Sequence, residues 1–224
     1  MSAIPLRQEI YYPESDGKPM AESELHREEM TYLIDALQHH FRNDADLHVG
    51  GNLLLYYVQG DPRKCVAPDV FVTKGMSKGL RKTYKLWEEG VPPCLVVEVT
   101  SDSTRDEDLG DKKALYRSLG VEEYILFDPL GDYLDPPLEG LVLRQGRYVR
   151  LPLAADGSLR SVTTGLVFRP KGQRLAVIDP GLGEVVPRDQ ELRVLYAVES
   201  ASRRAVEEEN ARLRAVLARL KQGS

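Results

Sequence analysis

The sequence predicts a mixed α/β domain, in which a sheet of parallel and antiparallel strands is flanked by helices and extended by a β meander, followed by a C-terminal helix. Three observations predict this class. A strand, a helix and another strand follow one another over residues 94–127. Short strand-like segments then alternate with Gly, Pro and Asp turns over residues 131–180. From about Glu191 the chain is rich in Ala, Glu, Arg and Leu. We therefore expect one domain over residues 1–185 and a helical appendage over residues 190–224.

The N-terminal part is expected to start as an irregular arm, because turn-forming residues recur through residues 1–20. A helix should follow, with Ser23 as its N-cap. Its apolar face repeats at three- and four-residue spacing and consists of Met30, Leu33, Ile34, Leu37 and Phe41. Residues 47–58 (LHVGGNLLLYYV) then predict one or two strands around Gly50 and Gly51.

The central stretch carries the clearest pattern. Residues 66–73 (VAPDVFVT) predict one short strand. Residues 94–100 (CLVVEVT) are almost continuously apolar, which is typical of a strand covered on both faces. A helix is expected over residues 105–119, ended by Gly120, and another buried strand over residues 123–127 (EYILF). This order favours a right-handed crossover between two parallel strands.

The C-terminal segment has a short heptad pattern. Its apolar seam recurs in alternating four- and three-residue steps through Val206, Asn210, Leu213, Leu217 and Leu220. A polar Asn in such a seam can fix the register of paired helices. The seam covers about two heptads, fewer than the three or four that define a coiled coil. We interpret it as a self-association helix of a homo-oligomer such as a dimer, because its Arg residues alternate with Glu, unlike a DNA-reading basic region.

Composition excludes several classes of protein. A formal net charge of −5 over 224 residues argues against a protein that coats nucleic acid by bulk charge, although it allows a local basic patch. Cys65 and Cys94 belong to no zinc motif; a disulfide is the alternative, but two lone cysteines favour buried thiols in a reducing compartment. The first residues lack the apolar core of a signal peptide. No apolar run approaches the ~18 residues of a membrane span. We therefore expect a cytoplasmic location and no membrane partner.

Two acidic residues interrupt otherwise apolar strands. Glu98 lies within LVVEV, and Asp69 lies within PDVFV. Burying an unpaired carboxylate is costly, so a cation, hydrogen bonds or a metal ion must compensate. If the two strands are neighbours, their carboxylates meet, and a divalent cation held by carboxylates and water would fit there. Such an ion can activate water and stabilise charge at a scissile phosphate. A purely structural buried pair is the alternative.

Lys112 is a third candidate, because it lies on the helix that follows the Glu98 strand. Beside a metal ion, a lysine can orient the attacking water or neutralise the charge that develops on the phosphate. The alternative is a simple set of charges on the helix surface, in which Asp108 and Asp111 accompany Lys112 and Lys113.

Several spaced motifs resemble one known family. Residues 68–72 (PDVFV) and 95–129 (LVVEVTSDSTRDEDLGDKKALYRSLGVEEYILFDP) are similar to the Uma-type (Uma-two) endonucleases of bacteria, within the PD-(D/E)XK restriction-endonuclease-like superfamily. The segments MAESELHREEM and GNLLLYY resemble one subgroup of that family, in which a helical tail of acidic and basic residues is frequent. The resemblance implies a restriction-endonuclease-like mixed sheet flanked by helices.

The resemblance also implies roles for individual residues. Asp69 takes the place of the superfamily's aspartate, and Glu98 that of the acidic residue in the (D/E)XK element. The main-chain carbonyl of Val99 would be a further metal ligand. The lysine expected two residues after Glu98 is absent, since that position is Thr100. In this family the basic role moves to the next helix, where Lys112 occupies the matching place.

Other residues are accessory candidates under the same resemblance. Lys113 is a neighbouring competitor of Lys112. Glu22 or His26 of the first helix could reach the site, as first-helix residues do in related nucleases. Tyr116 is a further candidate, although packing against the sheet is the favoured interpretation. The cofactor implied is Mg²⁺ or Mn²⁺.

A basic segment could contact nucleic acid. Residues 74–85 (KGMSKGLRKTYK) include Lys78, Arg81, Lys82 and Lys85, with aromatic residues nearby. Cations would bind the phosphate backbone and an aromatic ring would stack on a base. A solvated loop is an equal alternative. The remaining histidines, His39, His40 and His48, are expected at the surface, because no partner lies at metal-ligand spacing.

Two functions are open at this point. The first is a metal-dependent nuclease that hydrolyses phosphodiester bonds in nucleic acid, with DNA as the favoured substrate. The second is an inactive protein of nuclease fold that binds nucleic acid or protein. The sequence contains no Gly-rich phosphate loop, no GxSxG and no HExxH, so kinase, esterase and zincin chemistry have no support.

Overall fold

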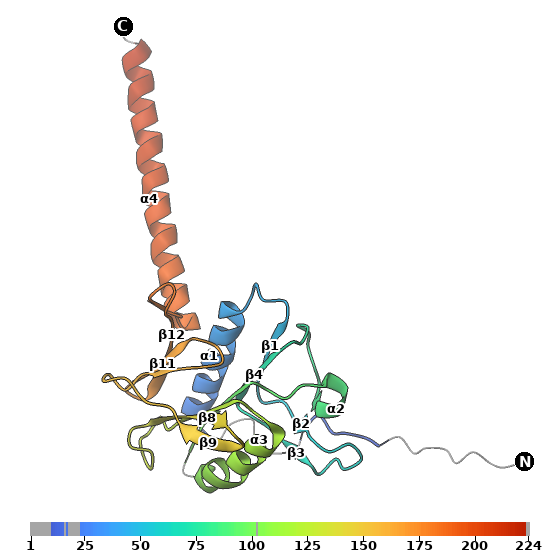
Figure 1. Cartoon of the computed structure of the whole chain (residues 1–224). Helices are drawn as coiled ribbons and strands as arrows, with labels where there is room; N and C mark the ends of the chain where they lie inside the picture. Colours follow the sequence, from blue (N-terminus) through green and yellow to red (C-terminus); the bar gives the residue numbers. More distant parts are fainter. Residues whose placement is uncertain (1–9, 16, 18–22, 102, 223–224) are drawn as a thin grey trace, which may run out of the picture. The chain divides into compact units, whose positions relative to one another are not determined.

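The computed structural model describes residues 10–15, 17, 23–101 and 103–222 of the chain. The chain divides into two compact units, residues 1–186 and residues 187–224. A six-stranded sheet organises the first unit, and a single helix makes up the described part of the second (Figure 1).

The six-stranded sheet has the order β1-β4-β6-β7-β8-β9. Its strands are β1 (Leu47–Gly50), β4 (Val70–Lys74), β6 (Leu95–Val99), β7 (Glu123–Phe127), β8 (Leu138–Arg144) and β9 (Arg147–Arg150). Strands β6 and β7 are parallel, and the other neighbours are antiparallel. The predicted mixed sheet and the predicted parallel pair are confirmed.

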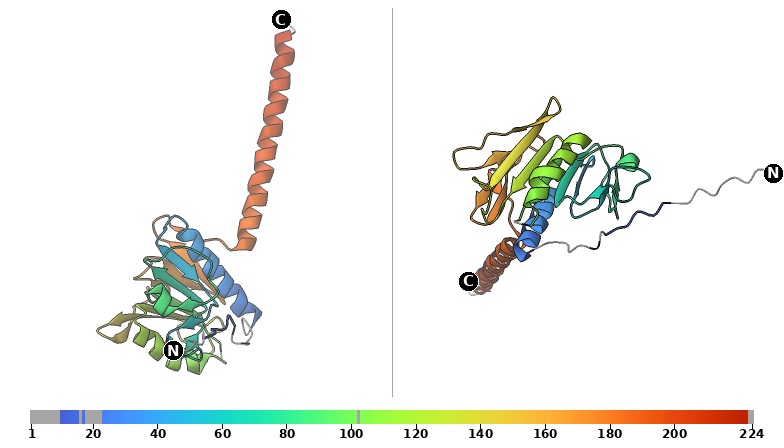
Figure 2. Two further views of the ribbon diagram at one scale, coloured as in Figure 1. Left: turned by 90° about the vertical axis from the view of Figure 1, so that its right-hand side faces the viewer. Right: turned by 90° about the horizontal axis from the view of Figure 1, so that it is seen from below.

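The central strands are buried on both faces. Along β6, Leu95, Val97 and Val99 belong to one core and Val96 to another, as the two-residue period of a strand requires. The first core includes apolar residues of helix α1 (Glu24–His40). The second includes Tyr116 of the crossover helix. Figure 2 shows these helices beside the sheet from two further directions.

Two smaller sheets complete the first unit. The four-stranded sheet consists of β10 (Leu159–Arg160), β11 (Val167–Lys171), β12 (Arg174–Asp179) and β13 (Glu184–Val185). The three-stranded sheet consists of β3 (Cys65–Val66), β2 (Leu55–Tyr56) and β5 (Tyr84–Lys85), followed by the short helix α2 (Leu86–Glu89). The predicted meander is therefore divided between two sheets: β8 and β9 extend the main sheet, and β10–β13 form the separate four-stranded sheet.

Helix α1 begins where the sequence predicts. The Ser23 side chain accepts a hydrogen bond from the backbone N–H of His26 at 3.0 Å, which confirms Ser23 as the N-cap. Met30, Leu33 and Leu37 are buried in the first core, and the other two predicted apolar residues are partly buried against it.

The single strand expected over residues 66–73 is wrong, because the chain forms two strands there. Strand β3 ends at Val66 and pairs with β2, whereas β4 begins at Val70 and joins the main sheet. Pro68 lies in the break; it has no N–H to donate to a ladder, and its carbonyl accepts from Asn52 N at 2.9 Å. Asp69 consequently lies immediately before β4, at the point where the chain changes sheets.

The crossover between β6 and β7 contains a π-helix. Helical geometry starts at Arg105, passes through η1 (Glu107–Lys112) and continues as α3 (Lys113–Leu119). Gly120, at a φ of 83°, ends the helix as predicted. Short π-helical turns in α-helices are often found at functional sites.

The second unit contains helix α4 (Asp189–Gln222), 34 residues long. Two residues of the predicted seam, Val206 and Leu213, are 58% and 51% exposed. The side chains of Leu217 and Leu220 lie outside the described part of the chain. Among the described residues, no helix combines the length and apolar character that crossing a membrane requires.

Candidate functional site

Asp69, which immediately precedes β4, lies beside Glu98 of the neighbouring strand β6. Val70 of β4 pairs with Val97 of β6, which places the preceding Asp69 beside Glu98. Asp69 N donates to Glu98 Oε2 at 3.3 Å, and Val99 N donates to Asp69 Oδ2 at 2.8 Å. Each carboxylate therefore accepts a backbone hydrogen bond from the other segment: Glu98 from Asp69 and Asp69 from Val99.

Glu98 is completely buried and has three donors around its carboxylate. The Tyr116 hydroxyl donates to Glu98 Oε1 at 2.6 Å, and Lys112 Nζ lies 3.2 Å from Oε2. Burial raises the pKa of Glu98, Lys112 and Tyr116 oppose the rise, and the carboxylates of Asp69 and Asp108 add to it, so that the pKa lies at about 8. The same burial, followed by the charge of Glu98, raises the pKa of Tyr116.

Lys112 bridges two buried carboxylates. Its Nζ lies 2.8 Å from Asp108 Oδ1 as well as near Glu98, and Asp108 is only 1% exposed. Burial by itself would lower the pKa of Lys112, but Glu98 and Asp108 outweigh burial and raise it. The surface-charge interpretation of Asp108 and Lys112 is therefore wrong. Lys113, the neighbouring competitor, takes part in none of the ion pairs found among the described residues.

Asp108 is the member of this cluster that sequence reasoning missed. The sequence does contain a pattern that indicates its position: Asp108, Lys112 and Tyr116 follow one another at four-residue spacing and so share one side of a helix. The Tyr124 hydroxyl donates to the Asp108 carbonyl at 3.0 Å, which ties this turn to β7.

The first helix also reaches the carboxylate pair. His26 Nε2 lies 2.9 Å from Asp69 Oδ2. The other first-helix candidate, Glu22, lies outside the described residues. The Asp69 side chain is 14% exposed, and within the described part of the chain no residue donates to its Oδ1. Of the two carboxylate oxygens of Asp69, Oδ1 is therefore the one that no described residue occupies with a hydrogen bond.

The donors present suit a hard divalent cation. Asp69 and Glu98 offer carboxylate oxygens beside each other, and the residue after Glu98 offers the Val99 carbonyl. Mg²⁺ is typically held by one or two carboxylates together with water and phosphate oxygens. Among the described residues, three or more His, Cys, Asp or Glu side chains do not gather into a metal cage.

The position two residues after Glu98 cannot supply a cation. Thr100 is 3% exposed, and its hydroxyl is hydrogen-bonded to the hydroxyl of Tyr133. The ammonium group near Glu98 comes instead from the following helix, through Lys112.

The four predicted nucleic-acid contacts are each engaged within the protein. Their partners are the Phe41 and Arg42 carbonyls for Lys78, Glu89 for Arg81, Glu14 for Lys82 and Glu88 for Lys85. Within the described chain, no contact joins them to the carboxylate pair, so the structure does not bring this segment and the pair together.

The expectation that three histidines lie at the surface holds only in part. His39 is exposed. His40 is half-buried, and its Nδ1 lies 3.2 Å from Asp179 Oδ2. The surface prediction is wrong for His48, which is 8% exposed, because β1 places it against Phe71 and Arg81.

A mixed sheet that brings two carboxylates together, with a lysine from the following helix beside them, is the arrangement that the resemblance to restriction-endonuclease-like proteins implies. The family described as "Uma2: Putative restriction endonuclease" matches residues 3–195, and the chain belongs to this family. The resemblance seen in the sequence is confirmed.

One solved structure and the curated proteins complete the comparison. The crystal structure described as a "putative nuclease belonging to DUF820" from Anabaena variabilis ATCC 29413 is 12% identical, with a TM-score of 0.47. The similarity covers 64% of this chain and 75% of that chain. No curated protein matches the chain.

Proposed function

We propose that this protein is a metal-dependent nuclease that hydrolyses phosphodiester bonds in nucleic acid, with DNA as its substrate. Asp69, Glu98 and the Val99 carbonyl would hold Mg²⁺ or Mn²⁺, and Lys112 would be the catalytic lysine. One observation carries the proposal: the Asp69 backbone and the Lys112 ammonium group converge on the same buried oxygen, Glu98 Oε2. We place the protein in the cytoplasm, a reducing compartment, because Cys65 and Cys94 belong to no zinc motif and two lone cysteines favour thiols over a disulfide.

Each residue would have a distinct part in the reaction. The divalent ion, when bound, supplies an activated water and a positive charge at the scissile phosphate. Lys112 remains protonated between Glu98 and Asp108 and can donate to the phosphate oxygen on which charge develops. Tyr116 holds Glu98 in place through Oε1, and His26 holds Asp69 through Oδ2, which leaves Asp69 Oδ1 for the cation.

Purified protein should cleave nucleic acid only when a divalent cation is present. We expect Asp69→Asn to lower the rate at least about a hundredfold, since the open carboxylate oxygen would become a neutral amide. Plasmid, linear duplex, single-stranded DNA and RNA should be incubated with Mg²⁺, Mn²⁺ or EDTA. Asp111→Asn is a matched control, because Asp111 is exposed and adjacent to Lys112. A wild type that cuts none of these substrates and binds no Mn²⁺ would instead favour the inactive binding module.

We also infer that two copies of the chain associate through α4. Apolar residues on this helix, including Val206 and Leu213, are more than half exposed in the single chain. A second copy would cover them, with Asn210 setting the register of the seam.

A charge placed in this seam should separate the copies. Leu213→Glu in the full chain is expected to convert a dimer to a monomer in light scattering, because two glutamates would meet across the interface. Ala211→Glu adds the same charge off the seam and should leave the dimer intact. Equal masses for both variants and the wild type would contradict this pairing.

A further inference from the structure

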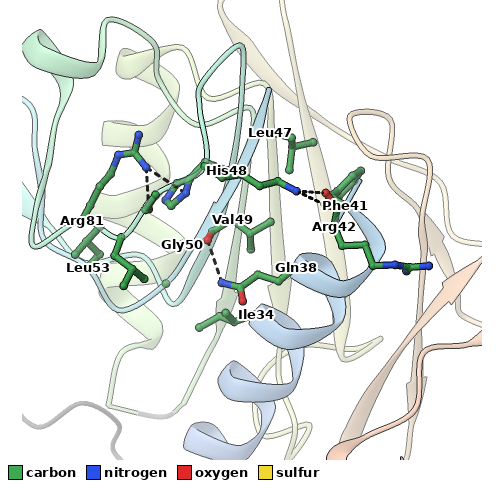
Figure 3. A pocket seen from close by; sticks show the side chains of 14 residues that line it. Ile34, Gln38, Phe41, Arg42, Leu47, His48, Val49, Gly50, Leu53 and Arg81 are labelled. Carbon is green, nitrogen blue, oxygen red and sulfur yellow. Dashed lines mark hydrogen bonds between the residues drawn. The ribbon is translucent and has the colours of Figure 1, made fainter. Parts of the chain in front are cut away.

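A nucleic-acid strand that lies on the carboxylate pair needs cations for the phosphates beside the scissile one. Basic side chains line a pocket of about 560 Å³ between β1, α1 and residues 78–81, but Figure 3 shows them turned towards partners in the protein. Lys78 donates to two carbonyls just after α1, at 2.6 and 2.8 Å, and Arg81 is paired with Glu89. A cation for the substrate is better sought nearer to Glu98.

Arg105 is a cation on the side of the crossover helix that faces Glu98. It precedes Asp108 by three residues, and Asp108 precedes Lys112 by four, so the three side chains share one side of the helix. Asp108 and Lys112 form the ion pair beside Glu98, whereas Arg105 is exposed. Arg105 therefore lies at the outer, N-terminal end of a row that leads inwards to Lys112.

The guanidinium group of Arg105 is held by an aromatic ring. Its Cζ lies 5.3 Å from the centre of the Tyr133 ring, within the range of a cation–π contact. The exposed acids Asp106 and Glu107 follow it, but the ion pairs between described residues include none with Arg105. A guanidinium group stacked on a ring keeps the N–H donors in its plane for an anion.

Tyr133 is itself fixed beside the Glu98 strand. Its backbone N–H donates to Asp128 Oδ2 at 3.0 Å, and the same buried carboxylate accepts from three further backbone N–H groups of this loop. The Tyr133 hydroxyl is hydrogen-bonded to the hydroxyl of Thr100. Thr100 lies two residues after Glu98, on the same side of the extended chain and about 7 Å further along it. The loop thus holds Tyr133, and Arg105 on its ring, next to the carboxylate site.

Electrostatic effects also connect Tyr133 with the buried ion pair. Burial raises the pKa of Tyr133, and the carboxylates of Asp128 and Asp108 add to the rise, whereas Arg105 opposes it. Asp108 is the carboxylate that lies 2.8 Å from Lys112 Nζ. Arg105 and Tyr133 are therefore close enough to the candidate site to act on the same substrate strand.

We propose that Arg105 binds the phosphate next to the scissile phosphate of a nucleic-acid substrate. This inference rests on the proposed nuclease function, because it takes the strand to lie over Glu98 and Lys112. Lys112 contacts the scissile phosphate, and Arg105, further out on the same side of the helix, binds the neighbouring phosphate through two N–H groups. Tyr133 holds the guanidinium group in position before the strand arrives, so less side-chain freedom is lost on binding.

Binding of fluorescent oligonucleotides in EDTA measures this contact without cleavage. Anisotropy titrations with single-stranded DNA, duplex DNA and RNA, at salt concentrations from about 50 to 200 mM, give the affinity and its salt dependence. Arg105→Gln removes the charge, Arg105→Lys keeps it, and Tyr133→Leu removes the ring. Arg117→Gln, which changes an exposed arginine at the far end of the same helix, is the matched control. The melting temperature of each variant shows whether its fold is intact.

We expect Arg105→Gln to bind at least about fivefold more weakly at low salt. The slope of log affinity against log salt concentration should become shallower by about 0.7 to 0.9, the value of one phosphate contact. Arg105→Lys should keep the wild-type slope. Tyr133→Leu should bind about two- to fivefold more weakly with the slope unchanged, because it removes the stacking and leaves the charge. Arg117→Gln should change neither quantity.

An unchanged slope in Arg105→Gln would overturn the proposal, because a purely structural contact between the helix and the loop has no effect on counterion release. Equal effects of Arg105→Gln and Arg117→Gln, or a wild type that binds none of the oligonucleotides, would also overturn it.

Cleavage assays separate this result from the nuclease proposal. In an active enzyme, Arg105→Gln should raise KM at least about fivefold and leave kcat nearly unchanged, since it removes a contact made equally in the ground state and the transition state. A wild type that cuts, with KM unaltered in Arg105→Gln, would contradict the role of Arg105 alone. A wild type that binds, shows the altered slope in Arg105→Gln and never cuts would support the phosphate contact and contradict the nuclease proposal.

Discussion

Replacing Glu98 by Gln is expected to abolish metal-dependent cleavage and, at the same time, to make the metal-free protein more stable at pH 8. The first effect follows if Glu98 is a metal ligand, because a neutral amide binds Mg²⁺ far more weakly than a carboxylate. The second follows from burial, which raises the pKa of Glu98 from 4.5 to about 8. A rate loss of at least about a hundredfold should therefore accompany a gain in stability.

The sign of the stability effect depends on which state holds the proton. Between pH 4.5 and about 8, folded Glu98 keeps its proton and unfolded Glu98 loses it, so the folded state binds more protons. The contribution of Glu98 to stability is therefore complete below pH 4.5 and is lost as the pH rises towards 8. Each pKa unit corresponds to about 1.4 kcal/mol. Glu98→Gln should match the wild type at pH 4 and exceed it at pH 8.

Urea unfolding in EDTA at pH 4, 6 and 8 measures this difference. Added Mn²⁺ should reverse the order at pH 8, because it binds and stabilises only the wild type. Glu107→Gln, an exposed position in η1, is the matched control and should leave both measurements unchanged. A Glu98→Gln protein that is less stable than the wild type at pH 8 in EDTA would show that Glu98 is a structural charge, held ionised by Lys112.

Lys112→Met should lose at least about a hundredfold in rate, whereas Lys113→Met should lose little. The two lysines are adjacent in the sequence, but only Lys112 contacts Glu98 and Asp108. Methionine keeps most of the side-chain volume and removes only the charge. Single-turnover cleavage with saturating Mn²⁺ compares the two variants directly.

Metal affinity distinguishes a catalytic lysine from a structural one. Removing the ammonium group from Glu98 Oε2 takes away a charge that competes with the cation, so Lys112→Met should bind Mn²⁺ at least as tightly as the wild type. Loss of this cation leaves Asp108 buried without its partner and should cost about 3–5 kcal/mol of stability. Asp108→Asn combined with Lys112→Met should recover part of that loss without restoring cleavage. Recovery of cleavage in the double variant would show that Lys112 acts only through stability.

The parts of the fold that the sequence predicts well are those set by local pattern. Ser23 caps a helix because its hydroxyl and the following apolar spacing act within one turn. The strand around Glu98 is recognisable from its apolar run, and Glu98 is recognisable as a site residue because a carboxylate within such a run requires a specific partner. For the same reason Asp69 and Glu98 could be proposed as neighbours before any coordinates.

The parts that could not be predicted depend on contacts between distant segments. The break at Pro68 arises because β3 pairs with β2 while β4 joins the main sheet. The residues on the two sides of Pro68 have the same apolar pattern, so the sequence does not distinguish the two strands. His48 is buried by Phe71 and by Arg81, which lies 33 residues away. Asp108 was considered only within the alternative of helix-surface charges, because other acidic residues surround it in the sequence.

The origin of the ammonium group near Glu98 affects how such chains can be detected. In this protein the acidic residue is on a strand and the lysine that contacts it is on a helix, with a connecting loop between the two. Their separation in the sequence is thus set by the length of that loop and by the register of η1, not by the two-residue period of a strand. A search for an acidic residue followed at fixed spacing by lysine would pass over this chain. A search for a buried acid, followed by a helix with acid, lysine and tyrosine at four-residue intervals, would find it.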